Sequence, residues 1–336
     1  MPIKIGIPSA LLFYEYYPLW ITFFEELGAE VIVSQSTNKE IVDIGIKNTV
    51  DEACLPVKVF HGHVLDLKDK VDFIFVPRIT SVRKYEYICP KFCGLPEMIK
   101  YSIKELPEII DTNIDFRKSK KNLNKTVMEI GSYITKDVKK IKNAFEYAMK
   151  EYNQYKNLMK KGFLPIDTLK KDPLKEIDLF NNRAKVLLLG HPYNLYDSYI
   201  SMDLIEKLRK HNLTVLTCET FSNEAINKKA ATLDKKMFWS FGRKILGTAL
   251  NAMEDDEICG IIYMSSFGCG LDSVIGDIVE RKIRRTSNKP FTLLTIDEHT
   301  GEAGVDTRIE AFVDMIKWRA DHENNLSTHR KFIYPN

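Results

Sequence analysis

The sequence predicts an α/β protein made of two similar domains, each built on a doubly wound parallel sheet. Its 336 residues exceed the roughly 100–200 residues of a usual single domain. Short, continuous apolar runs alternate along the chain with amphipathic helical segments, as they do in doubly wound sheets. The same order of strand, Gly- and Pro-marked turn, aromatic cluster, helix and strand also occurs twice, which indicates a repeated topology.

The first copy begins with a strand, continues through a turn that contains Tyr14, Tyr16 and Tyr17, and enters a helix that ends at Leu27 and Gly28. Its strands are predicted at residues 3–7, 31–33 and 71–77. The last of these runs is apolar without alternation, which indicates a strand buried on both faces of a parallel sheet. Further helices are predicted at residues 57–68 and 95–103.

The second copy repeats this pattern, with Tyr193 and Tyr196 in the turn that follows its first strand. Its strands are predicted at residues 186–189, 214–216, 258–264 and 291–296. Its helices are predicted at residues 203–210, 238–253, 271–285 and 307–321. Both domains are therefore expected to be Rossmann-like or flavodoxin-like, with ligands bound outside the carboxyl ends of the strands.

The domain boundary is expected in the polar stretch between the two copies. Residues 127–160 carry apolar side chains at helical spacing and lysines on the other face, which predicts one long connecting helix. We therefore predict an N-terminal α/β domain at residues 1–120, a helical connector at 121–182, and a C-terminal α/β domain with its last helix at 183–336.

Composition argues against several classes of function. The chain is 44% hydrophobic and 28% charged, with a formal net charge of +3, so charge gives no support for nucleic-acid binding. No apolar run approaches the roughly 20 residues that cross a bilayer, and the N-terminus enters a strand pattern and not a signal peptide. A cytoplasmic protein that binds neither nucleic acid nor membrane is expected.

Four of the six cysteines are candidate ligands of one site. Cys54 precedes a predicted helix, whose positive N-terminus would favour a thiolate, although a small buried hydrophobic side chain is the alternative. Cys89 and Cys93 form a C-x3-C loop, and Cys269 lies between two glycines at a strand end. Because three of these thiols lie in the first half and one in the second, a single site requires the two domains to face each other across a cleft.

The two remaining cysteines are less favourably placed. Cys218 follows a strand and is a reserve candidate for the site, whereas Cys259 begins a strand and is expected in the core. An iron–sulfur cluster and a structural zinc ion use the same thiolate ligands. The Cys–Pro pair and the neighbouring glycines favour a cluster modestly, because they let backbone amides approach the sulfurs.

Longer segments carry a resemblance to a known family. They are Glu52-Ala-Cys-Leu-Pro-Val-Lys58, His61-Gly-His63, Phe75-Val-Pro77 followed by Cys89-Pro90, Gly190-His-Pro-Tyr193, Ser266-Phe-Gly-Cys-Gly-Leu-Asp-Ser273 and residues 296–312. The chain resembles the 2-hydroxyacyl-CoA dehydratase and benzoyl-CoA reductase superfamily, and in particular the iron–sulfur domain associated with acyl-CoA dehydratase activases. The resemblance covers nearly the whole chain.

The resemblance implies an oxygen-sensitive cluster between the domains, most often [4Fe-4S] held by cysteines, with a double-cubane cluster in some relatives. It also implies reduction by a partner activase, an ATPase of the ASKHA type, and an acyl-CoA acceptor. In the dehydratases one iron is left open for the substrate carbonyl, and a fourth thiolate here would close it. The chain has neither G-x-x-x-x-G-K-[ST] nor G-x-G-x-x-G, so any ATP dependence is expected to come from the partner. A dimer is a further expectation.

Candidate catalytic side chains follow the strand at 291–296. Glu298, His299 and Glu302 would lie at the same sheet edge as Cys269, where they could move protons during reduction or cap and pack the next helix. Lys58, His61 and His63 follow Cys54 on one helix, where they could contact the cluster or face solvent.

Three hypotheses about function follow. The first is a low-potential iron–sulfur redox protein that takes electrons from the ATPase and passes them to a difficult acceptor, as a reductase or dehydratase component. The second is a non-catalytic electron-transfer or cluster-carrying subunit. The third is a structural zinc protein with a partner-binding cleft.

Overall fold

Two four-stranded parallel sheets organise the structure, a computed structural model that describes residues 1–115, 122–169, 184–233 and 235–326. The first sheet has the order β2-β1-β3-β5 and the second the order β10-β9-β7-β8. Their strands are β1 (Lys4–Ile7), β2 (Glu30–Val33), β3 (Phe73–Phe75), β5 (Glu108–Ile110), β7 (Lys185–Gly190), β8 (Thr214–Leu216), β9 (Ile258–Ser266) and β10 (Phe291–Ile296). In both sheets the first strand lies between the second and the third. The α/β class with parallel sheets is confirmed.

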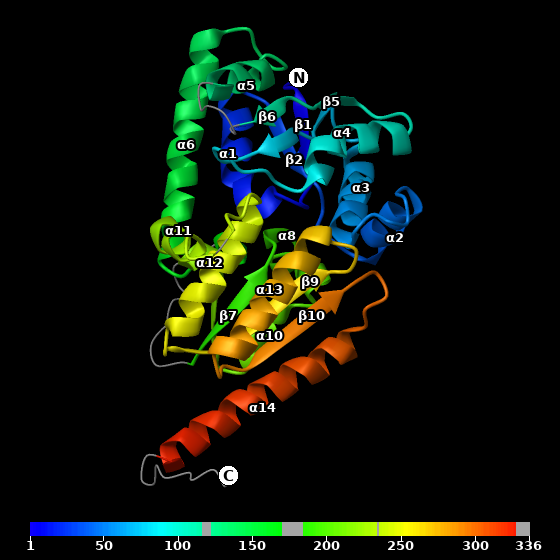
Figure 1. Cartoon of the computed structure of the whole chain (residues 1–336). Coiled ribbons are helices and arrows are strands. Elements are labelled where there is room, and N and C mark those ends of the chain that lie inside the picture. The colour runs from blue at the N-terminus through cyan, green and yellow to red at the C-terminus, as the bar shows by residue number, and fades with distance from the viewer. Residues whose placement is uncertain (116–121, 170–183, 234, 327–336) are drawn as a thin grey trace.

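Helices surround both sheets, and the two sheets lie one beyond the other along the molecule (Figure 1). The predicted helices are present as α1 (Phe13–Glu26), α3 (Leu55–Leu67), α4 (Pro90–Ser102), α10 (Leu204–Lys210), α12 (Ser240–Glu254), α13 (Gly270–Thr286) and α14 (Glu302–Leu326). The sequence did not predict α2 (Lys39–Lys47), α7 (Pro165–Thr168), α8 (Pro192–Leu195), α9 (Ser198–Ser201), the 3-10 turn η2 (Cys218–Thr220), α11 (Asn223–Ala230), or the two-stranded sheet of β4 (Arg78–Ser81) and β6 (Asn113–Asp115).

The single helix predicted at residues 127–160 is wrong, because the structure has two helices there. They are α5 (Asn122–Gly131) and α6 (Val138–Lys160). Gly131 ends α5 against the side chain of Ile141, and Asp137 caps α6 by accepting hydrogen bonds from the N–H groups of Lys139 and Lys140. α6 runs along α1 and reaches η2 in the second half (Figure 1). Much of the rest of the predicted connector, residues 170–182, lies outside the described residues.

One hydrophobic cluster extends through both halves of the chain. It contains Val64 and Ile74 from the first half together with Leu188 and Ile262 from the second, and all four side chains are fully buried. A second cluster packs the other face of the first sheet against α1, α5 and α6. Because apolar burial is the main stabilising term in folding, the shared cluster holds the two sheets together.

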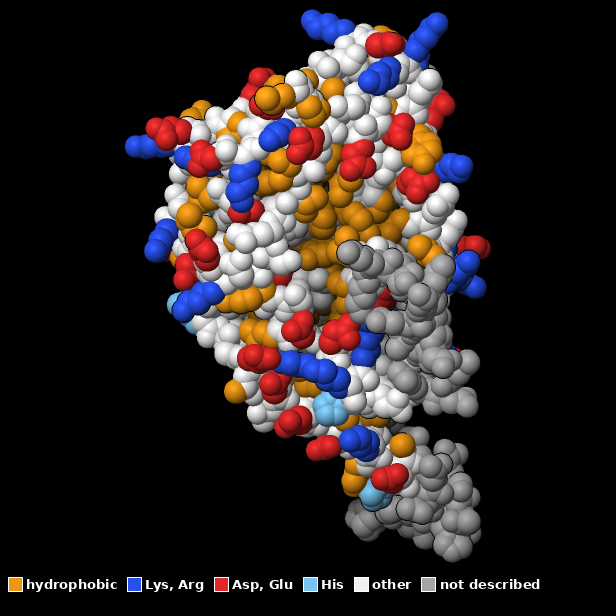
Figure 2. Space-filling model, turned by 180° about the vertical axis from the view of Figure 1, so that it is seen from behind, with side chains coloured by type: hydrophobic (Ala, Val, Ile, Leu, Met, Phe, Trp, Pro, Cys, Tyr) orange, Lys and Arg blue, Asp and Glu red, His pale blue; other side chains and the backbone are white. Residues whose placement is uncertain are grey.

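The face of the molecule opposite to that of Figure 1 carries Lys and Arg intermixed with Asp and Glu around a central hollow of hydrophobic side chains (Figure 2). No helix in the described part of the chain is both long and apolar enough to cross a membrane.

The backbones of α2 and α3 touch at two glycines. A Cβ atom on Gly62 would lie 2.0 Å from the carbonyl oxygen of Ile41, and one on Gly45 would lie 2.1 Å from that of Lys58. No side chain fits at these distances, so α2 would have to move away from α3.

We therefore expect Gly62→Ala to lower the free energy of unfolding by about 2 kcal/mol or more, the cost of overpacking a tight contact. The matched control is Gly304→Ala in α14, where no heavy atom lies within 4 Å of the added Cβ; it should be neutral or stabilising by up to about 1 kcal/mol. Urea denaturation measures both, and equal effects would contradict the close approach.

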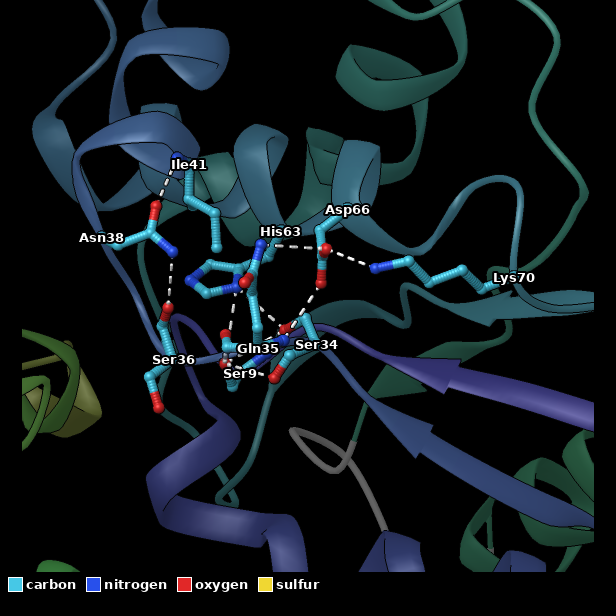
Figure 3. Close-up of polar contacts among 9 residues, drawn as sticks. All are labelled: Ser9, Ser34, Gln35, Ser36, Asn38, Ile41, His63, Asp66 and Lys70. Atoms are coloured by element: carbon cyan, nitrogen blue, oxygen red, sulfur yellow. Dashed lines mark hydrogen bonds and ion pairs between the residues drawn. The ribbon is translucent and has the colours of Figure 1, made fainter.

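A buried polar chain joins the two halves through His63 of α3. The imidazole Nδ1 lies 2.8 Å from the hydroxyl of Ser34 and 3.4 Å from that of Ser9 (Figure 3), and Nε2 lies 2.9 Å from the hydroxyl of Thr37. Thr37 in turn donates a hydrogen bond to the carboxylate of Asp197, the N-cap residue of α9 in the second half. Burial raises the pKa of Asp197 to about 6, although the hydrogen bonds that Asp197 accepts act in the opposite direction. Burial also lowers the pKa of His63 to about 4.

These shifts predict a pH dependence for Asp197→Asn. Between pH 4 and 6 the folded protein keeps a proton on Asp197 that the unfolded chain has released, so the carboxyl contributes less stability as the pH rises. Relative to wild type, the variant should gain roughly 2–3 kcal/mol in the free energy of unfolding between pH 4 and 7. The opposite contribution of His63 is common to both proteins and cancels in this difference.

The control for this pH series is Asp43→Asn on α2, whose side chain is exposed. Its difference from wild type should stay nearly constant over the same pH range. A constant difference for Asp197→Asn as well would contradict the raised pKa.

Candidate functional site: a cysteine centre between the two sheets

Three cysteines from both halves of the chain come together at the starts of three helices. Cys54 is the N-cap residue of α3, Cys89 that of α4 and Cys269 that of α13. Gly268, at φ +74°, turns the chain before Cys269, and a Cβ atom on it would lie 4.0 Å from the Cα of Cys54. The positive ends of three helices therefore meet at one place, where they favour negative charge.

Electrostatics confirm that these three thiols are neighbours. Burial, followed by the charge of Asp272, raises the pKa of Cys269 well above its usual range, and charge on Cys54 or Cys89 raises it further. Burial also raises the pKa of Cys54, opposed by Lys91 and reinforced by Cys89. The pKa of Cys89 is raised by burial, opposed by the backbone and charge of Lys91. The favourable helix ends do not offset desolvation, so all three thiols stay protonated at neutral pH.

We expect this protonation to slow alkylation in metal-free protein. At pH 7, iodoacetamide should modify Cys54, Cys89 and Cys269 more slowly in the native protein than in urea, because burial raises their pKa values and leaves less reactive thiolate. The effect should be largest for Cys269, at least about tenfold, since each unit of pKa removes about nine-tenths of the remaining thiolate. Peptide mass spectrometry of timed samples measures the three rates. Equal rates in native and unfolded protein would show that the thiols are not desolvated.

The other three cysteines lie in different surroundings. The Sγ atom of Cys93 lies 3.6 Å from the hydroxyl of Thr80, and its backbone carbonyl accepts a hydrogen bond from Arg78. Cys218 is buried in η2, where burial raises its pKa to about 12. Cys259 begins β9, and its Sγ lies 3.0 Å from the carbonyl oxygen of Lys185, at the opposite end of the strand from Cys269.

Polar side chains without hydrogen-bond partners surround Cys269. His191, Cys269 and Asp272 each offer a ligand atom, and these atoms all lie within 4.8 Å of one another, so this buried group could hold a metal ion. Among the described residues, both ring nitrogens of His191 and the Oδ2 atom of Asp272 have no hydrogen-bond partner, and His191 Nε2 lies 3.3 Å from Asp272 Oδ1. Tyr193 stacks on His191 at 4.9 Å between ring centres. Buried polar atoms are rarely left unpaired, so this arrangement is suited to a bound group.

The predicted acidic residues lie at the edge of this region. Glu298 forms a buried ion pair with Lys58 of α3, with Nζ and Oε1 2.5 Å apart; burial opposes ionisation of Glu298, but the hydrogen bond and charge of Lys58 outweigh it and lower its pKa. His299 is exposed, and Glu302 pairs with Lys207 of α10 while 65% exposed. Glu298 and Glu302 also line a cavity of about 370 Å³ beside Leu55, next in sequence to Cys54.

The three helix-start thiols are spaced more widely than the ligands of a single tetrahedral ion. A zinc ion with bonds of about 2.3 Å would hold its thiolate sulfurs within about 4 Å of each other. No trio of cysteines in the described part of the chain has all its sulfurs within 4.8 Å. A cluster instead binds each thiolate to a different iron atom, which separates the sulfurs more widely.

Sequence reasoning missed the roles of His191 and Asp272. His191 directly follows β7, whose carboxyl end lies beside that of β9, and Asp272 lies in the first turn of the helix that Cys269 begins. The rule that located Cys269, the position at the carboxyl end of a parallel strand, would also have located His191.

The fold and this site define an α/β protein with a buried, cysteine-rich centre between two parallel sheets. Residues 4–221 match the family model of the CoA enzyme activase uncharacterised domain (DUF2229), and because this match spans well over half of the chain, the protein belongs to that family. The matched region contains Cys54, Cys89, Cys93 and His191 and ends before Cys269. No curated protein matches the chain.

Proposed function

We propose that the chain is a low-potential redox protein that holds an iron–sulfur cluster at Cys54, Cys89 and Cys269. The observation that carries this proposal is the convergence of one buried thiol, that of Cys269, and two partly buried thiols, those of Cys54 and Cys89, at the N-termini of α13, α3 and α4. In this proposal the two sheets belong to two similar domains, residues 1–120 and 183–336, joined by residues 121–182. Cys93 is the candidate for a fourth ligand, because it follows Cys89 one turn later on α4, and Cys218 is the reserve.

The residues around the thiols have defined tasks in this proposal. The three helix N-termini stabilise negative charge on the cluster, and the backbone N–H of Asp272, 3.4 Å from the Sγ atom of Cys269, donates a hydrogen bond to that sulfur. Such hydrogen bonds and the surrounding burial adjust the reduction potential of a bound cluster. The Lys58–Glu298 ion pair fixes α3 to the loop after β10 and so sets the position of Cys54 relative to the second half.

Family membership supports the partner that we propose. The family description refers to CoA enzyme activases, so the partner side is a CoA enzyme and its activase. An ATPase partner would supply the electrons, since the chain has neither of the two glycine-rich phosphate-binding motifs. The acceptor would be an acyl-CoA, reduced or dehydrated at the cluster if one iron has no thiolate ligand.

The sequence left two tasks open for Glu298, His299 and Glu302, either to move protons or to cap and pack the next helix. The buried pair with Lys58 favours a structural task for Glu298, whereas His299 is accessible to solvent and is the better placed of the three to exchange protons with it.

Two alternatives each rest on a specific observation. If Cys93 closes the fourth coordination position, the protein would be a non-catalytic electron-transfer or cluster-carrying subunit. The His191–Cys269–Asp272 group favours a single metal ion, such as zinc, bound by nitrogen, sulfur and oxygen ligands.

Metal analysis of anaerobically purified protein tests the proposal. We expect iron and acid-labile sulfide in near-equal amounts, and a loss of most of both in Cys269→Ala, because removal of one ligand from a buried cluster exposes it to solvent. The matched control is Cys259→Ala, which removes a half-buried thiol at the other end of β9 and should retain the cluster.

The alternatives give different results in the same samples. One equivalent of zinc without sulfide in the wild-type protein, with loss of the zinc in both Cys269→Ala and His191→Ala, would show that the site binds a single metal ion and not a cluster. Absence of bound metal in wild-type protein would refute the redox proposal.

A further inference from the structure

A second cavity, separate from the cysteine centre, lies where the two halves meet the connector. It has a volume of about 400 Å³ and is lined by α1, α6, η2, α11, α12 and the loop that follows β4. Side chains from both halves and from α6 therefore build its walls. Of the cysteines considered for the cluster, only the reserve candidate Cys218 lines it.

Positive charge dominates the walls of this cavity. Five Lys and Arg side chains line it against the two carboxylates of Glu15 and Glu219. Both carboxylates are already engaged: Lys244 lies 2.8 Å from Glu219 and 3.6 Å from Glu15, and Lys156 lies 2.9 Å from Glu15. Even with the neighbouring Glu86, which pairs with Arg243 at 2.8 Å, positive charges outnumber negative charges by two. Such an excess of positive charge around a cavity attracts an anion.

Two of the cations form a clamp. Arg83, in the loop after β4, and Arg243, on α12, donate hydrogen bonds of 2.9 and 2.6 Å to the same amide oxygen, Oδ1 of Asn227. Both guanidinium groups also lie beside the buried carboxylate of Glu86, Arg243 at 2.8 Å and Arg83 at 3.6 Å. Burial, followed by the charge of Arg83, nevertheless outweighs the attraction of Glu86 and lowers the pKa of Arg243. An anion between the two guanidinium groups would relieve their repulsion, and the planar guanidinium fork matches the oxygen atoms of phosphate.

The start of α12 adds an independent observation. Ser240, its first residue, lines the cavity and is 5% exposed, yet its hydroxyl has no hydrogen-bond partner among the described residues. The N-cap residue, Trp239, makes no side-chain hydrogen bond to the first turn of the 15-residue helix. A buried, unpaired hydroxyl at a positive helix end is the arrangement that binds anions at helix N-termini.

We propose that this cavity binds a phosphate-bearing small molecule, held by Arg83, Arg243 and Ser240. Tyr16 lines both this cavity and the adjoining apolar pocket, whose other walls include Trp20 and Phe92. The phosphate group of an organic ester can thus lie among the cations while an apolar substituent enters the pocket past Tyr16. Phe92 lies on α4 between Cys89 and Cys93, so the pocket connects the two sites through one helix.

Calorimetric titration at constant ionic strength tests the proposal, with inorganic phosphate and phenyl phosphate as probes. We expect saturable binding of one equivalent. Arg83→Gln should weaken it roughly tenfold, because a charge-assisted hydrogen bond is worth about 1.5–3 kcal/mol, a tenfold effect or more. Ser240→Ala should weaken binding by a smaller factor. Lys282→Gln, an exposed lysine on α13, is the matched loss of charge and should bind as wild type does.

The two probes distinguish the source of the phosphate. Tighter binding of phenyl phosphate identifies an organic ester as the ligand, and equal binding identifies free phosphate. Because Arg243 holds the buried Glu86, it is tested as the double variant Glu86→Gln/Arg243→Gln, which removes the buried carboxylate together with its partner. The second carboxylate contact, that of Arg83, is lost as well, but the side chain of Arg83 is 39% exposed. The double variant should also weaken binding.

Absence of saturable binding by millimolar amounts of either probe would overturn the proposal, and so would equal affinity in wild type and Arg83→Gln. These binding measurements do not depend on the iron content of the samples. The proposal of the anion site and the proposal of the cluster are therefore tested independently.

Discussion

The direction of the parallel strands determines where the helix starts that form the candidate site lie. In a parallel sheet, each helix that follows a strand begins at the carboxyl edge of the sheet, with its positive end at that edge. The carboxyl edges of the two sheets face one another, so the starts of α3, α4 and α13 meet between them. The cysteines at these three helix starts therefore lie at the interface between the two sheets.

The same constraint separates what the sequence could predict from what it could not. The buried strands of the second sheet were predicted because their continuous apolar runs reflect burial on both faces, as for β9, where eight of its nine residues are buried. The meeting of Cys54 with Cys269 followed from strand direction. The three-residue strands β5 and β6 gave no such pattern, because at that length a strand and a loop contain the same residues.

Contacts between side chains distant in sequence could not be predicted. Thr37 and Asp197 are 160 residues apart, and Arg83 and Asn227 are 144 apart, and no local pattern connects either pair. The break between α5 and α6 depended on a tertiary contact as well, because Gly131 packs against the side chain of Ile141. Gly131 and Asp137 are local signals for a helix end and a helix start, but the apolar spacing continues across them and suggested one continuous helix.

The hydrophobic cluster shared by the two halves has a consequence for how the buried centre can be reached. To swing the halves apart as on a hinge, the molecule would have to separate the ring pairs Tyr14–Tyr196 and Phe92–Tyr193, which pack across the two halves, and expose these aromatic side chains to water. Such opening would be too rare to admit a partner at every turnover. In the proposed redox role, electrons would therefore have to cross the protein wall by tunnelling, while a small substrate would enter through local movements of the surrounding loops.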